Sequence, residues 1–189
     1  MSRKKDTKKY GFTLVETMVS IAILSVAILG TFTAVQSSLQ NSGFAKDQVT
    51  AFYLTQEAVE YIRNIRDTNA IQNIATPTNW LTGLAASAGD PCYFGKTCQI
   101  DVPNNKVTMC PGGTGSCAVL SQDSNTALFG YAPNWTPTRF KREIQFEASP
   151  DVPYVSGVPQ EVIVHVTMSW TSGSFAKSFT VDQTLFNWH

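Results

Sequence analysis

The sequence predicts an α+β protein, in which a long N-terminal helix packs against an antiparallel β-sheet head with a disulfide-bearing loop region. Three observations predict this class. No proline interrupts the chain before Pro77, the C-terminal third alternates apolar and polar residues, and a loop-rich stretch between them holds all four cysteines. We expect four parts: a basic leader at 1–11, an apolar helix at 12–43, an amphipathic helix at 44–72 and a loop-rich β head at 73–189.

The N-terminal end has the charge pattern of a membrane protein. The chain has no net charge, but residues 1–11 carry five basic residues against Asp6 alone, and this leaves nine basic and thirteen acidic residues elsewhere. The run from Phe12 to Val35 would form a helix about 36 Å long, enough to cross a hydrocarbon core of about 30 Å. The preceding lysines should stay cytoplasmic, which places the C-terminal body outside. This pattern gives no support to nucleic-acid binding.

A removable secretory signal is the simpler interpretation of this run. However, the run is longer than a typical signal core, and no small-x-small cleavage site follows it cleanly. The run also contains one acidic residue, Glu16. A carboxylate in hydrocarbon costs several kcal/mol, roughly, so neither a signal nor a simple anchor accounts for Glu16.

The residues around Glu16 match a specific pattern. The stretch from Gly11 to Glu16, "GFTLVE", resembles the processing site of bacterial type IV pilins and type II secretion pseudopilins. The resemblance implies cleavage between Gly11 and Phe12 by a membrane-embedded aspartyl prepilin peptidase, which removes the leader. It also implies N-methylation of the new Phe12 amine by the same enzyme.

The same resemblance supplies a role for Glu16. Its carboxylate would pair with the N-terminal amine of a neighbouring subunit during filament assembly, because opposite charges attract strongly at low dielectric. The implied partners are the peptidase, other pilin subunits in a helical filament and the assembly platform in the cytoplasmic membrane. The precursor would sit in that membrane with a cytoplasmic N-terminus, and the mature subunit would then enter an extracellular filament at the cell surface.

The second half of the predicted helix is apolar on one face only. Large apolar residues recur there at three- and four-residue steps, and we expect Val49, Phe52, Val59 and Ile62 to pack on the strands. A helix from Phe12 to about Asp67 would be about 84 Å long, far more than a membrane requires.

The cysteines are expected to form disulfides. Their spacing, C-x5-C-x11-C-x6-C, is not that of a zinc site, and disulfides are ordinary on an exported domain. Three pairings are possible. A hairpin over 99–109, turning at Asn104-Asn105, favours the nested pairing Cys98–Cys110 with Cys92–Cys117; the sequential pairing Cys92–Cys98 with Cys110–Cys117 is the alternative.

The C-terminal third predicts strands. Apolar residues alternate from Phe140 to Ala148, with Arg142 as the exception on the apolar side, and more regularly from Val162 to Trp170. A turn at Ser172-Gly173 should return the chain as a partner strand from Phe175 to Phe186.

No catalytic, metal or cofactor site can be assembled from the sequence, so we do not expect an enzyme. Neither His165 nor His189 has a recognisable catalytic partner, and the glycines of 112–115 are better explained by positive φ than by phosphate binding. We therefore expect a structural subunit of a type IV pilus (fimbrium). Because the head is large and loop-rich, and its order of elements resembles minor pilins of the pilus-modification type, a minor pilin is favoured. A type II secretion pseudopilin and a single-pass anchored surface-binding or adhesion module are the alternatives.

Overall fold

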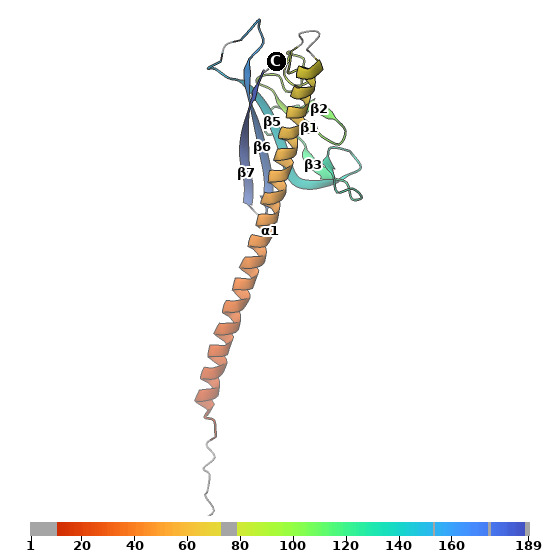
Figure 1. Ribbon diagram of the computed structural model, residues 1–189. Helices are drawn as coiled ribbons and strands as arrows, with labels where there is room; N and C mark the ends of the chain where they lie inside the picture. The colour runs from red at the N-terminus through yellow and green to blue at the C-terminus, as the bar shows by residue number, and fades with distance from the viewer. Residues whose placement is uncertain (1–10, 73–78, 153, 174, 188–189) are drawn as a thin grey trace, which may run out of the picture. The chain divides into compact units, whose positions relative to one another are not determined.

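A computed structural model describes residues 11–72, 79–152, 154–173 and 175–187. Most of the predicted leader, residues 1–10, and His189 lie outside the described residues. The chain divides into two units, residues 1–45 and 46–189, and helix α1 (Leu14–Gln72) contributes to both (Figure 1). The long helix, the antiparallel sheet and two disulfides confirm the predicted α+β class.

The helical part of the first unit is almost uncharged, and it is apolar nearly all round as far as Val35. No charged residue occurs between Glu16 and Lys46, and the side chains of residues 11–43 are exposed. From Leu14 to Val35 its hydroxyl groups each donate to a backbone carbonyl three or four residues earlier: Thr17 to Leu14 at 2.8 Å, Ser20 to Glu16 at 2.7 Å, Ser25 to Ile21 at 2.7 Å, Thr31 to Ile28 at 2.9 Å and Thr33 to Gly30 at 2.9 Å. By length and composition this helix can cross a membrane.

The second unit contains a seven-stranded sheet in which every pairing is antiparallel. Long strand β5 (Thr136–Ala148) is its centre, because it pairs with β1, β3 and β6. The remaining strands are β1 (Thr97–Asp101), β2 (Lys106–Met109), β3 (Val119–Gln122), β4 (Phe129–Gly130), β6 (Glu161–Ser172) and β7 (Phe175–Phe186). The alternating C-terminal pattern thus predicted β5, β6 and β7 correctly, and β7 pairs only with β6.

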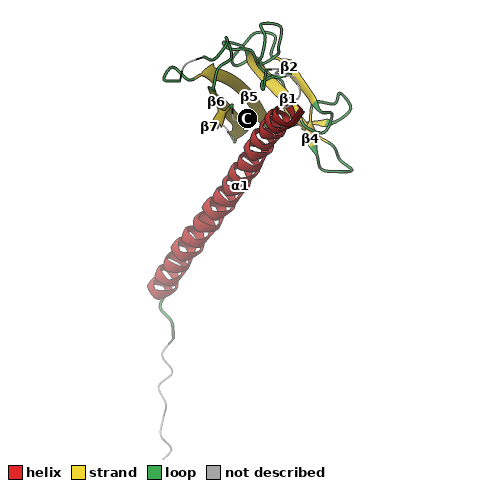
Figure 2. Ribbon diagram, turned by 45° about the horizontal axis from the view of Figure 1, so that its top comes forward, coloured by secondary structure: helices red, strands yellow, loops and turns green. Residues whose placement is uncertain are grey.

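The core of this unit lies between one face of the sheet and residues 51–62 of α1 (Figures 1 and 2). From α1, the core contains Ala51, Leu54, Thr55, Ala58, Val59 and Ile62. The prediction for Val59 and Ile62 is confirmed, but Val49 and Phe52 are 55% and 56% exposed, so their predicted place in the core was wrong. Small residues, Ala51, Thr55 and Ala58, alternate in this face with larger aliphatic ones, which allows the helix to lie close to the sheet.

The expected nested disulfides were also wrong, although the hairpin that suggested them is present. The observed bridges are sequential, Cys92–Cys98 and Cys110–Cys117. In the β1–β2 register Cys98 lies opposite Met109, and the Cys110 N–H instead bonds the carbonyl of Thr97 at 2.9 Å. Neighbouring residues of a strand point to opposite faces, so this one-residue difference keeps Cys98 and Cys110 from meeting.

Arg142, the exception in the apolar pattern, joins three elements of the core. It is fully buried on β5. One guanidinium nitrogen donates to the Leu54 carbonyl at 2.5 Å and to the Glu57 carboxylate at 2.8 Å, both on α1. The other donates to the Ile100 carbonyl on β1 at 2.7 Å. A buried cation is tolerable only with such partners, so Arg142 fixes the helix against β1 and β5.

Candidate processing and assembly site

The predicted processing site lies at the exposed start of α1. The backbone N–H of Glu16 donates to the Thr13 hydroxyl at 3.3 Å, and the N–H of Thr17 donates to the Thr13 carbonyl at 3.2 Å. Thr13 is therefore the N-cap, which satisfies one of the four N–H groups that a helix start leaves without partners. The spacing Thr-x-x-Glu is that of a capping box.

The cap leaves the bond between Gly11 and Phe12 outside the helix. Residues 11–13 have no regular secondary structure, and Phe12 is 78% exposed. The backbone hydrogen bonds of a helix would have to break before a peptidase could bind this bond in an extended form. Because the helix begins only at Leu14, that cost does not arise here.

Glu16 is exposed in the first turn of the helix. An acidic residue there interacts favourably with the positive end of the helix dipole. Among the residues that the structure describes, no ion pair joins its carboxylate. The carboxylate is thus available to a cation from outside the described part of the chain.

Comparison with known proteins bears on this end of the chain. A family model described as the prokaryotic N-terminal methylation motif matches residues 6–32. The N-terminal part of the chain is type IV pilin-like. No curated protein and no solved structure matches the pilin-like chain. The motif, which covers Gly11, Phe12 and Glu16, indicates a structural subunit of the pilin or pseudopilin kind and implies processing by a prepilin peptidase and assembly with other pilins.

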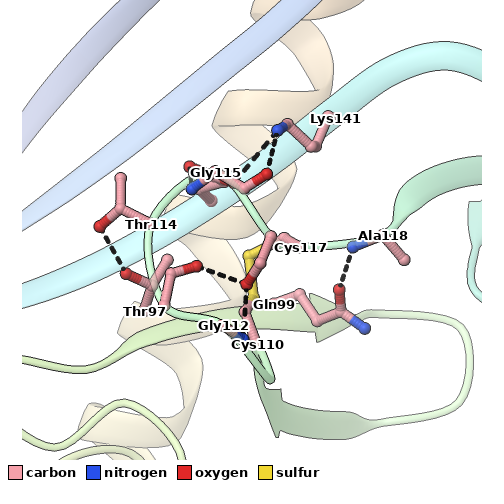
Figure 3. Close-up of polar contacts among 12 residues, drawn as sticks. Thr97, Gln99, Cys110, Gly112, Thr114, Gly115, Cys117, Ala118 and Lys141 are labelled. Carbon is pink, nitrogen blue, oxygen red and sulfur yellow. Dashed lines mark hydrogen bonds and ion pairs between the residues drawn. A yellow bond between two sulfur atoms is a disulfide. The ribbon is translucent and has the colours of Figure 1, made fainter.

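The head of the pilin-like chain displays a short disulfide-closed loop at 110–117 (Figure 3). Gly113 and Gly115 have φ of 75° and 86°, so positive φ explains these two glycines; a Cβ at Gly112 would instead lie 3.0 Å from the Cβ of Ser116. Within the loop the Ser116 hydroxyl donates to the Gly113 carbonyl at 2.6 Å and accepts from the Gly112 N–H at 2.9 Å. These contacts use backbone groups that a phosphate-binding loop would leave open.

Side chains of β5 hold this loop against the sheet (Figure 3). The Gly115 N–H donates to the Glu143 carboxylate at 3.0 Å, and the Lys141 ammonium donates to the Gly115 carbonyl at 2.9 Å. The Thr114 hydroxyl accepts from the Gln145 amide at 2.6 Å. The loop is therefore presented in one conformation, which sequence spacing alone did not indicate.

His165 lies on the sheet face opposite α1 and joins three strands. Its Nδ1 is 2.7 Å from an Asp182 oxygen on β7, and its Nε2 is 3.2 Å from a Glu147 oxygen on β5. Both contacts can be hydrogen bonds at once only when both ring nitrogens carry protons. The hydrogen bond with Asp182 is the main cause that raises the pKa of His165, and Glu147 adds to it. With both nitrogens occupied, the ring has no site for a catalytic partner or a metal ion.

This cluster predicts a pH-dependent stability. The pKa of His165 is raised in the folded state. Its contribution to the free energy of unfolding is therefore fully present below about pH 6.5 and is lost as the pH rises through the raised pKa. The groups are partly solvated, so the contribution should be below about 1 kcal/mol. Urea unfolding of the full chain in detergent at pH 5 and pH 8 measures it. His165→Gln should be destabilised relative to wild type at pH 5 only; an equal difference at both pH values would contradict the prediction.

In the described residues, no group of three or more His, Cys, Asp or Glu side chains is arranged to hold a metal ion. The sequence-predicted site residues thus fall into two separate places. Gly11, Phe12 and Glu16 lie together at the start of α1, and the four cysteines lie in the head. The capping role of Thr13 was missed, although the Thr-x-x-Glu spacing that signals it is readable in the sequence.

Proposed function

We propose that this chain is a minor pilin, a structural subunit of a type IV pilus-like filament. The observation that supports this most is the methylation motif with Glu16 at the start of an uncharged, exposed helix. The large head with its fixed disulfide loop suits a subunit present in few copies, exposed on the filament surface or at its tip. A type II secretion pseudopilin has the same N-terminal chemistry and differs in where its filament forms.

Processing changes the charge at this end of the chain. The peptidase hydrolyses the amide bond between Gly11 and Phe12. The oxygen of the attacking water becomes part of the new Gly11 carboxylate, and the Phe12 nitrogen leaves as an amine that is protonated and therefore cationic. Methylation leaves that amine protonated at neutral pH. The basic leader, which holds the N-terminus on the cytoplasmic side, is removed in the same step.

The new amine then supplies the partner that Glu16 lacks. In the apolar core of a filament an ionised carboxylate or an amine alone is strongly penalised, whereas a close pair is not. Pairing between Glu16 of one subunit and the Phe12 amine of its neighbour therefore favours one axial register between adjacent helices. The uncharged helix surfaces on either side pack without breaking any other charge pair.

Measuring the intact mass and N-terminal peptide of the protein from its own cells tests this proposal. We expect a chain that begins at N-methylated Phe12. Gly11→Val is the matched control: nothing lies within 4 Å of a Cβ placed at Gly11, so the fold should tolerate the change while processing stops. A wild-type chain that begins at Met1 or Ser2 would overturn the proposal and favour an anchored surface-binding module.

A further inference from the structure

The residues that failed to join the core form a groove on the outside of the head. Val49, Phe52 and Tyr53 of α1 are 55%, 56% and 65% exposed. At about 100° per residue, Phe52 lies roughly 90° around the helix from the centre of the buried face, and Val49 and Tyr53 lie farther round. Together with half-buried Phe179 and Val181 of β7, they line a groove of about 590 Å³.

The groove is uncharged as well as apolar. Apart from the five apolar residues, only Gln48 and Gln56 line it. β7 is the last strand on that side of the sheet and pairs only with β6. Its side chains that point toward α1 are therefore only partly covered by the helix, and Phe179 and Val181 are half-buried. An exposed apolar patch that gathers several large side chains in one hollow is typical of a contact site, whereas single exposed apolar residues are common on any surface.

One segment of the chain has the surface that this groove requires. Residues 17–35 carry no charge, are helical and are exposed, and the Ser and Thr hydroxyls among them all donate to carbonyls of their own helix. A charged or strongly solvated partner would lose water in the groove without compensation, whereas this helix has little to lose. Once such a helix leaves the membrane, it needs apolar cover from other molecules.

We infer that the groove between α1 and β7 binds the apolar N-terminal helix of the neighbouring pilin-like subunit in the filament. Val49, Phe52 and Tyr53 then provide one wall of the contact, and Phe179 and Val181 the other. The two glutamines can donate to helix carbonyls, which accept a second hydrogen bond, so their burial carries little cost. This inference rests on the proposed function, because it identifies the head surface that takes part in filament assembly.

Photocrosslinking from position 52 tests the inference. A photoreactive benzoylphenylalanine replaces Phe52 in the full chain, intact filaments are irradiated, and the crosslinked peptides are identified by mass spectrometry. We expect crosslinks to residues 12–43 of another subunit. The same residue at Phe175, which is 71% exposed on β7 but does not line the groove, should not reach that segment.

A pair of substitutions gives a second readout. Phe52→Gln should lower the fraction of subunits incorporated into filaments, and Phe175→Gln should not, because both side chains are exposed but only Phe52 lines the groove. Filaments that form normally but crosslink from position 52 only to head residues, or not at all, would overturn the inference alone. A wild-type chain that is never found in filaments would overturn the proposed function instead.

Discussion

Replacing Glu16 with glutamine should hold the chain in the membrane and remove it from filaments sheared off cells. Glutamine keeps the shape of the side chain, and a capping box accepts either Glu or Gln three residues after the N-cap Thr13. The helix start is therefore retained and only the charge is lost. The neighbour's amine would then be buried without a partner, at a cost of about 3–5 kcal/mol. We expect incorporation to fall by roughly 100-fold or more, since each 1.4 kcal/mol is about tenfold.

Two further variants separate charge from local structure. Ser20→Ala removes only a hydroxyl that donates to the carbonyl of Glu16, so it should assemble like wild type. Glu16→Ala should fail at least as severely as Glu16→Gln. The N-terminal peptide of each variant must be measured, because an unprocessed chain would also be absent from filaments. Normal incorporation of a processed Glu16→Gln chain would exclude the charge pair.

The largest expected effect on stability is that of Arg142→Met. The substitution leaves the carbonyls of Leu54 and Ile100 without their charged donor and the Glu57 carboxylate without its ion pair. Glu57 retains contact with water, so we expect a loss of about 3 kcal/mol in the free energy of unfolding, the lower end for a broken buried pair. Urea unfolding of the full chain measures this loss.

Arg139→Met is the matched control on the same strand. Arg139 also pairs with an acidic residue of α1, Asp47, at 2.9 Å, but its side chain is 52% exposed. An exposed pair contributes less than about 1 kcal/mol, so this variant should unfold close to wild type. An equal loss of unfolding free energy in the two variants would show that the burial of Arg142 does not determine how much it contributes to stability.

The sequence predicted those features that depend on a regular pattern. Alternation from Phe140 onward predicted β5 and β6 because each of these strands has one buried face, and the turn that follows predicted β7. The methylation motif was readable because its leader, glycine, glutamate and apolar run occur together, and the family model matches residues 6–32. Arg142 was visible as an exception, but only the contacts of its guanidinium explain why a cation belongs there.

The errors arose where large side chains were given more weight than small ones, or where one residue of register decided the outcome. Val49 and Phe52 are more apolar than Ala51 and Thr55, yet the small residues are the ones that face the sheet. The register of the hairpin was predicted with an error of one residue. Because of this shift, Cys98 lies opposite Met109 and not opposite Cys110. Composition predicts neither outcome. The first depends on which side chains let the helix lie close to the sheet, and the second depends on the register of two strands.

The two walls of the groove are about as far apart in the sequence as the head allows. One is formed by residues 49–53 and the other by residues 179–181, in the middle of the last strand. The groove therefore exists only after the whole head has been synthesised, exported and folded with β7 in place. If a neighbouring helix must dock there, a truncated or misfolded subunit cannot be taken up, and assembly itself becomes a test of whether each head is complete.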